Sequence, residues 1–216
     1  MTDKFIKNEQ INFIRNQINL IKDSTSKNVP HAVLKAVKDM ANAKILSLIP
    51  HGTSEQQNVL DIAQLKTDDE YHQYMNHLME FVIPFPQISN THLKKLFPKN
   101  KKLKLPDLSK IDRSQLTYFS WLDVSSNKRI IMYELEGELV GIESKDTPTS
   151  KKNICSFCDG YGEVTYFSTI VKEKKSKNPD YYKSRGNYIC TDSSLCNKRI
   201  TSVDYLTSYL KDVLAR

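Results

Sequence analysis

The four cysteines constrain the fold of this chain more than any other feature of its sequence. They form two pairs, Cys155-x-x-Cys158 and Cys190-x5-Cys196, with 31 residues between the pairs. Two thiolates three positions apart can hold one ion from a tight turn, and a second pair completes a tetrahedron when the chain folds back. The spacing therefore predicts one structural Zn²⁺ held by Cys155, Cys158, Cys190 and Cys196.

Two disulfide bridges are the alternative use of these cysteines. No stretch approaches the roughly 20 apolar residues of a membrane span, and residues 1–9 lack the apolar core of a signal peptide. We therefore expect a cytoplasmic protein with no membrane partner, and a reducing compartment favours metal over disulfides. All five histidines precede the cysteines, so four thiolates are the closed ligand set available locally. A closed set leaves no position for a reactive water, which favours a structural zinc.

Charge is divided unevenly along the 216 residues. Residues 1–85 carry nine Lys and Arg against ten Asp and Glu, whereas residues 86–216 carry 23 against 15. The net excess of +7 thus comes entirely from the cysteine-bearing part, where it suits an acidic protein surface or RNA. With the length, this asymmetry predicts two domains, residues 1–83 and 84–216.

The first 83 residues show the periodicity of amphipathic helices. One apolar stripe has steps of three, four and three residues, at Ile11, Ile14, Ile18 and Ile21. A second stripe follows Pro30, and the capping-box patterns Thr53-x-x-Gln56 and Thr67-x-x-Glu70 open two further helices. Four such helices with short connections predict an antiparallel four-helix bundle.

Beyond residue 84 the sequence changes to the composition of strands. Segments rich in aromatic and β-branched residues lie at 116–122, 129–135, 139–142, 164–171 and 187–189. Thr201-x-x-Asp204 resembles the cap of a terminal helix. A CxxC turn, a hairpin and a second ligand pair leading into a helix are typical of a treble clef, with Thr191–Leu195 looping out between strand and helix. We therefore predict a C-terminal mixed α/β domain with a treble-clef-like four-cysteine zinc site.

The chain lacks the motifs of common enzymes. It has no Gly-rich phosphate loop, no nucleophile elbow and no recognisable pair of catalytic carboxylates. We predict a binding protein rather than an enzyme. Tyrosines among cationic side chains also fit a zinc-dependent RNA-binding protein, which would use the lysines of 94–104 and 172–183. The first of these runs also suits a solvated connector between domains.

The residues around the cysteines resemble a known family. Asn187–Thr201, with Cys155-Ser-Phe-Cys158, is similar to the metal site of the FusB-type elongation factor G-binding proteins, which confer fusidic acid resistance. The likeness covers most of 81–216 and extends to 81–85, 96–106, Trp121 and 126–131. It implies a four-helix bundle followed by an α/β domain with a four-cysteine zinc site.

The resemblance also implies a function and a surface. It implies that the protein binds elongation factor G, on and off the ribosome, and releases the factor when fusidic acid has locked it there with GDP. By position, the partner-facing residues would be Ile154, Arg185, Tyr188 and Tyr209. For the two tyrosines, packing within the domain is the alternative role, because buried tyrosines are common. We expect a monomer, with direct RNA contact allowed but not required.

Overall fold

The computed structural model describes residues 3–109, 111–171 and 183–215. The chain divides into two compact units, Met1–Ile83 and Pro84–Arg216. Within the described residues, no helix combines the length and the apolar character that crossing a bilayer would require.

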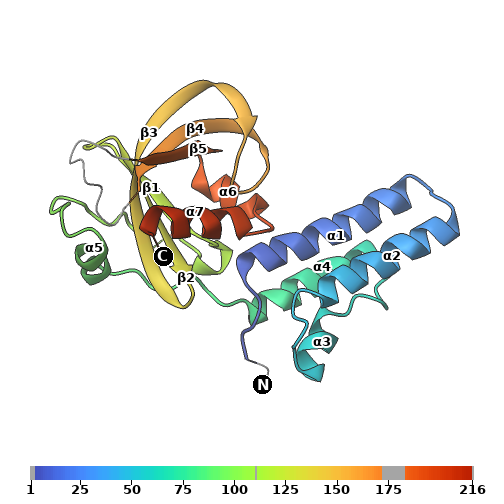
Figure 1. Ribbon diagram of the computed structural model, residues 1–216. Coiled ribbons are helices and arrows are strands. Elements are labelled where there is room, and N and C mark those ends of the chain that lie inside the picture. The colour runs from blue at the N-terminus through green and yellow to red at the C-terminus, as the bar shows by residue number, and fades with distance from the viewer. Residues whose placement is uncertain (1–2, 110, 172–182, 216) are drawn as a thin grey trace. The chain divides into compact units, whose positions relative to one another are not determined.

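The first unit is helical. Its elements are α1 (Asn8–Ser26), α2 (His31–Leu46), α3 (Ser54–Leu60), α4 (Asp68–Leu78) and the 3₁₀ turn η1 (Met79–Phe81) (Figure 1). The predicted isoleucine stripe of α1 is buried and shares one core with apolar residues of the other three helices. Burial of that stripe, rather than intrinsic helix propensity, supplies most of the stability of such a unit. The helices predicted from periodicity are therefore present, although α3 is only two turns long.

Both predicted capping boxes form. The Thr53 hydroxyl accepts from the Gln56 N–H at 3.2 Å, and the Gln56 side chain accepts from the Thr53 N–H at 2.9 Å. At the start of α4, the Glu70 carboxylate accepts from the N–H groups of Thr67 (2.7 Å) and Lys66 (2.6 Å). These backbone donors lower the pKa of Glu70 because they stabilise the charged carboxylate.

The second unit is built on a five-stranded antiparallel sheet whose strands follow one another in chain order. The strands are β1 (Phe119–Asp123), β2 (Lys128–Leu135), β3 (Glu138–Ile154), β4 (Tyr161–Ile170) and β5 (Ser184–Cys190). β3 extends far beyond the predicted 139–142, because its polar second half pairs with β4 up to the Ile154–Tyr161 register position. Figure 1 shows β3 as the long curved strand of the sheet, and its register shifts between Pro148 and Lys152.

Each face of this sheet carries its own core. Along β2, Ile131 and Tyr133 face one core, and Ile130 and Met132 face the other, as strand geometry requires. On the first face lie the helices α6 (Ser193–Arg199) and α7 (Asp204–Leu214) with all four cysteines. On the second lie α5 (Asn90–Leu96) and the segment that contains η2 (Arg113–Gln115). The cysteines are thus part of a continuous apolar core.

Candidate metal centre

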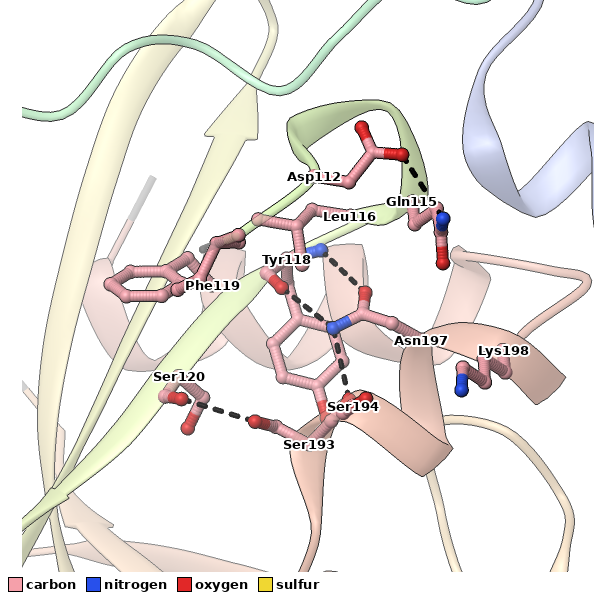
Figure 2. A pocket seen from close by; sticks show the side chains of 11 residues that line it. Asp112, Gln115, Leu116, Tyr118, Phe119, Ser120, Ser193, Ser194, Asn197 and Lys198 are labelled. Carbon is pink, nitrogen blue, oxygen red and sulfur yellow. Dashed lines mark hydrogen bonds between the residues drawn. The ribbon is translucent and has the colours of Figure 1, made fainter. Parts of the chain in front are cut away.

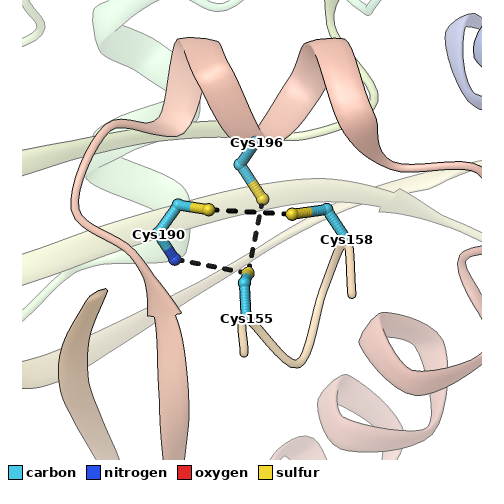
Figure 3. Close-up of side chains that lie close together, drawn as sticks. All are labelled: Cys155, Cys158, Cys190 and Cys196. Carbon is cyan, nitrogen blue, oxygen red and sulfur yellow. Dashed lines mark hydrogen bonds between the residues drawn. The ribbon is translucent and has the colours of Figure 1, made fainter. Parts of the chain in front are cut away.

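The four cysteine sulfurs converge on one point (Figure 3). All four Sγ atoms lie within 4.8 Å of one another. The Cys155 and Cys196 sulfurs are 3.7 Å apart, and those of Cys158 and Cys190 are 3.6 Å apart. A disulfide would bring two sulfurs to about 2.05 Å, and all four thiols are free, so the disulfide alternative is wrong.

The geometry fits a zinc ion. A tetrahedral Zn²⁺ with four thiolates at about 2.3 Å has sulfur–sulfur edges of about 3.8 Å, close to the two separations measured here. Thiolates are preferred zinc donors, and four of them complete the coordination shell. The protein therefore has one structural zinc site, as the spacing predicted.

The first ligand pair lies on a tight turn between β3 and β4. The turn is closed by hydrogen bonds from the Asp159 N–H to the Cys155 carbonyl (2.8 Å) and from the Cys155 N–H to the Gly160 carbonyl (3.0 Å). Phe157, between the ligands, is buried and packs edge-on against the rings of Tyr118 and Phe167. This aromatic anchor fixes the turn to the core of the unit.

The second ligand pair spans the end of β5 and the start of α6. Cys190 is the last residue of β5, whereas Cys196 lies in the first turns of α6. The Asp192 side chain caps α6 by accepting from the Ser194 N–H at 2.8 Å. The prediction that residues 191–195 loop out is therefore wrong for 193–195, which are helical. A helical turn brings Cys196 back towards Cys190, and this explains the five-residue spacing.

Hydrogen bonds and charge favour a cation among these sulfurs. The N–H groups of Phe157 (3.4 Å) and Cys190 (3.3 Å) both donate to the Cys155 sulfur. The pKa of Cys155 is lowered, because hydrogen bonds from Cys158, Cys190 and Cys196 stabilise its thiolate. The pKa of Cys196 is raised, because its thiol donates to the Cys155 thiolate. Zinc binding releases the remaining thiol protons and replaces them with one doubly charged ion.

A buried asparagine joins the metal centre to the sheet (Figure 2). The Asn197 carbonyl oxygen accepts from the N–H groups of Thr117 (2.8 Å) and Tyr118 (3.1 Å). Its amide nitrogen donates to the carbonyls of Tyr118 (2.9 Å) and Ser193 (3.0 Å). The three bonds to Thr117 and Tyr118 hold α6 against the residues that lead into β1, beside a cavity of about 350 Å³, and the bond to Ser193 lies within α6. Sequence reasoning missed Asn197; its only signal is its place next to a ligand cysteine.

A buried ion pair supports the other side of the second ligand pair. The Arg129 Nε lies 3.1 Å from the Asp146 carboxylate, and both side chains are almost fully buried. The same guanidinium donates to the Thr191 carbonyl at 3.3 Å, and the Thr165 hydroxyl donates to Asp146 at 2.9 Å. β2, β3 and β4 are thereby joined to the residue that follows Cys190. No local sequence pattern indicated this contact.

The four residues implied as partner-facing lie along and beside β5. Ile154, next to Cys155, is 57% exposed, and half-buried Tyr188 accepts a backbone hydrogen bond from Ser156 in the metal turn. At the other end of β5, the Arg185 guanidinium lies 3.3 Å from the Asp212 carboxylate at the surface.

Tyr209 differs from the other three residues. It is only 6% exposed, and its hydroxyl donates to the Thr169 hydroxyl (3.0 Å) and the Arg185 carbonyl (3.1 Å). The structure therefore places Tyr209 within the core, in the packing role that the sequence had left open for it. Two exposed tyrosines near the ligands, Tyr161 and Tyr166, were not singled out for this surface from the sequence.

The lysines of the first predicted RNA-binding run are exposed on and after α5, at Lys94, Lys95, Lys99, Lys101, Lys102 and Lys104. Of the second run, 172–183, only Lys183 lies within the described residues. The metal centre and this lysine run are therefore two separate features of the same unit.

Comparisons with known proteins agree with this architecture. The family model of the elongation factor G-binding protein N-terminal region matches residues 5–86, and that of the FBP C-terminal treble-clef zinc finger matches residues 95–207. A search of curated proteins gave no match. Among solved structures, the fusidic acid resistance protein FusC superposes with a TM-score of 0.80 at 26% identity, over 97% of this chain and 98% of that one. The zinc-finger model alone spans more than half of the chain, which therefore belongs to the FusB-type family of elongation factor G-binding proteins.

Proposed function

We propose that this protein binds elongation factor G through its zinc-bearing unit and frees the factor when fusidic acid holds it, with GDP, on the ribosome. The family assignment and the likeness to FusC, a fusidic acid resistance protein, support this function. The single structural observation that carries it is a group of apolar side chains beside the metal turn, of which Ile154, Tyr161 and Tyr166 are exposed and Tyr188 is half-buried. We name these four residues the knuckle surface.

The knuckle surface has the composition of a protein interface. Ile154 and Tyr161 are register partners across β3 and β4, and they are 57% and 67% exposed. Tyr166 and Tyr188 are register partners across β4 and β5, with their rings edge to face at 5.4 Å. Tyrosines supply large and rigid contact area at protein interfaces, often as the residues that dominate affinity. Zinc contributes by holding the turn between β3 and β4 against the end of β5.

Arg185 and Tyr209 are proposed to act together at the other end of β5. The Arg185 guanidinium is half-exposed and pairs with Asp212 at the surface, where an ion pair contributes little to stability. It can therefore exchange Asp212 for an acidic group of the partner at small cost. Tyr209 would support this contact from within, because its hydroxyl bonds the Arg185 carbonyl.

The proposed release needs no covalent chemistry. Fusidic acid holds the factor in one conformation on the ribosome. A protein that binds another conformation of the factor more tightly lowers the population of the locked state, by an amount set by its differential affinity. The protein would thus act as a binding partner and not as an enzyme.

A release experiment tests this function. Ribosomes stalled with elongation factor G, GTP and fusidic acid are incubated with the zinc-loaded protein, and the factor left on the pelleted ribosomes is measured. We expect the wild type to release the factor and Ile154→Ala to release less. The matched control is Val124→Ala, an 83% exposed aliphatic residue in the turn between β1 and β2, at the opposite edge of the sheet. Absence of release by the wild type, or equal losses in the two variants, would refute the proposal.

Direct RNA binding is a second candidate, favoured by the six exposed lysines from Lys94 to Lys104. Such binding would release counterions, so its affinity would fall steeply with added salt. Replacing three of these lysines, Lys99, Lys101 and Lys102, by Gln would weaken RNA binding and leave a knuckle-surface interaction intact. Filter binding to ribosomal RNA at two salt concentrations separates the two functions.

A further inference from the structure

We propose that the free edge of β5, at Ser184 and Gly186, binds one extended segment of the partner protein as an additional strand of the sheet. This inference rests on the proposed binding of elongation factor G and specifies how the factor would be held. It adds main-chain hydrogen bonds to the side-chain contacts of the knuckle surface, as in other proteins that bind extended peptides at a sheet edge.

The direction of the backbone groups of β5 follows from its ladder with β4. β5 pairs only with β4 and therefore forms an edge of the sheet. At the two ends of this ladder, the Val171 N–H donates to the Lys183 carbonyl (2.8 Å) and the Thr191 N–H donates to the Glu163 carbonyl (3.2 Å). The odd-numbered residues of β5 thus bond β4, and the even-numbered residues direct their N–H and C=O groups outward.

The outward groups of β5 are bonded at the end near the metal and free at the other end. The Tyr188 carbonyl accepts from the Ser156 N–H at 2.9 Å, and the Cys190 N–H donates to a ligand sulfur at 3.3 Å. For the outward groups of Ser184 and Gly186, the described part of the chain supplies no hydrogen-bond partner. Ser184 is exposed and Gly186 is half-buried, so another strand can reach these groups.

At the opposite edge of the sheet, side chains of α6 bond the outward groups. Just before β1, the Asn197 amide bonds both the N–H (3.1 Å) and the carbonyl (2.9 Å) of Tyr118. Within β1, the Ser120 carbonyl accepts from the Ser193 hydroxyl at 3.1 Å. Proteins commonly cover their sheet edges in such ways, because unpaired edge groups are a template for a further strand. The contrast favours the open end of β5 as the edge that a partner extends.

Gly186 allows an aromatic ring to line this edge. A Cβ atom at position 186 would lie 2.6 Å from the Tyr166 hydroxyl oxygen and 2.8 Å from the Phe167 carbonyl oxygen, and both separations are too short. Because glycine has no Cβ, the Tyr166 side chain can lie across β5 with its hydroxyl beside Gly186. Tyr188, the register partner of Tyr166, follows on the same face. Side chains of an added strand would therefore contact the knuckle surface.

Charge specifies the partner segment further. Successive residues of a strand face opposite sides of the sheet, and Arg185 faces α7, where its guanidinium lies 3.3 Å from the Asp212 carboxylate. On an added strand, an acidic side chain opposite Arg185 would compete with Asp212 for the guanidinium. Cross-strand pairs of opposite charge stabilise a sheet. We therefore expect an extended segment that carries an acidic residue at this register position.

The test compares Ser184→Pro with Ser184→Ala in the full-length, zinc-loaded protein. Proline lacks the N–H group, and it is tolerated at the start of an edge strand where that group faces away from the sheet. Alanine removes the same hydroxyl but keeps the N–H, so it is the matched control. Affinity for elongation factor G is measured by calorimetric titration. We expect Ser184→Pro to bind at least about tenfold more weakly than Ser184→Ala, with zinc content unchanged.

The outcomes separate this inference from the function on which it rests. Equal affinities of the two variants, while the wild type binds the factor, would overturn the strand addition alone. A wild type that does not bind the factor would overturn the proposed function and the inference together.

Amide hydrogen exchange on the wild type gives a second test that needs no variant. Exchange is carried out in the free protein and in the complex with elongation factor G, quenched, and measured for each amide by NMR. We expect the Ser184 and Gly186 amides to exchange fast in the free protein and to be protected in the complex. The Arg185 and Asn187 amides, which bond β4, should be protected in both and serve as the internal control.

Unchanged exchange at Ser184 and Gly186 in the complex would overturn the inference, because contacts through side chains alone would not protect these two amides. If instead both amides are protected in the protein alone and sedimentation shows a dimer, the edge binds a second copy of the chain. That result would also overturn the inference.

Discussion

The helical unit and the zinc-bearing unit hold their cores together by different means. In the helical unit, the patterns that form the helices are local: apolar residues recur at helical spacing, and both capping boxes join residues three positions apart. Its distant hydrogen bonds include backbone pairs, such as the Phe5 N–H and the Phe81 carbonyl (2.9 Å). In the zinc-bearing unit, hydrogen bonds from buried side chains join distant residues. Asn197 bonds Thr117, 80 positions away, and Arg129 bonds Thr191, 62 positions away. The metal site likewise joins two cysteine pairs that are distant in sequence. We therefore expect the two units to respond differently to the same type of damage.

The largest effect is expected for Cys190→Ser, because structural zinc contributes about 10 kcal/mol or more of apparent folding free energy in small zinc domains. The variant should lose zinc and the stable fold of the second unit, while α1–α4 stay folded. Amide NMR spectra and zinc content, before and after chelation of the wild type, would show this. A variant that melts like the wild type would contradict the distinction between the two units.

Arg129→Met should produce the next largest effect, since it leaves the Asp146 carboxylate buried without its cation. Breaking a buried ion pair on one side typically costs about 3–5 kcal/mol. Denaturant unfolding of the zinc-bearing unit measures the loss. The double variant Arg129→Met with Asp146→Leu should recover most of it, because no buried charge remains. A double variant as unstable as the single one would show that the ion pair is not the cause.

Ile14→Ala is the corresponding test of the helical unit. Ile14 is fully buried in the first core, and truncation of such a residue to Ala costs about 2–5 kcal/mol. The unfolding transition of α1–α4 should move to lower denaturant, whereas zinc affinity stays at the wild-type value. Weaker zinc binding in this variant would mean that the two units do not fold independently.

Loss of a cap should have the smallest effect. Thr67→Ala removes the hydroxyl that accepts from the Glu70 N–H, and such a change typically costs about 1 kcal/mol.

The same cap predicts that the stability of the helical unit falls at acid pH, because the pKa of Glu70 is lowered by the N–H groups of Thr67 and Lys66. Its stabilisation is present above the ordinary pKa of glutamate and is lost as the pH falls through the lowered value. Glu70→Gln should therefore flatten the acid side of the stability curve; an unchanged curve would argue against the cap.

The same contrast explains what could be predicted from sequence. The helices and the zinc site are encoded in short spacings, such as the isoleucine stripe and the CxxC turn, and both predictions are confirmed. The length of β3 was missed because residues 143–153 are polar and include Pro148; pairing with β2 up to Lys145 and with β4 from Lys145 onward makes them a strand. Asn197 and Arg129 act on partners distant in sequence, so no local pattern indicates them. The burial of Tyr209 likewise depends on how α7 packs on the sheet.

Calorimetric titration of the zinc-loaded protein into the host's own elongation factor G, at low and moderate salt, is the direct test of the proposed binding. We expect saturable one-to-one binding that changes little with salt and is lost in Tyr188→Ala, with the zinc content of the variant intact. No binding to the factor, together with tight and strongly salt-dependent binding to ribosomal RNA, would contradict it.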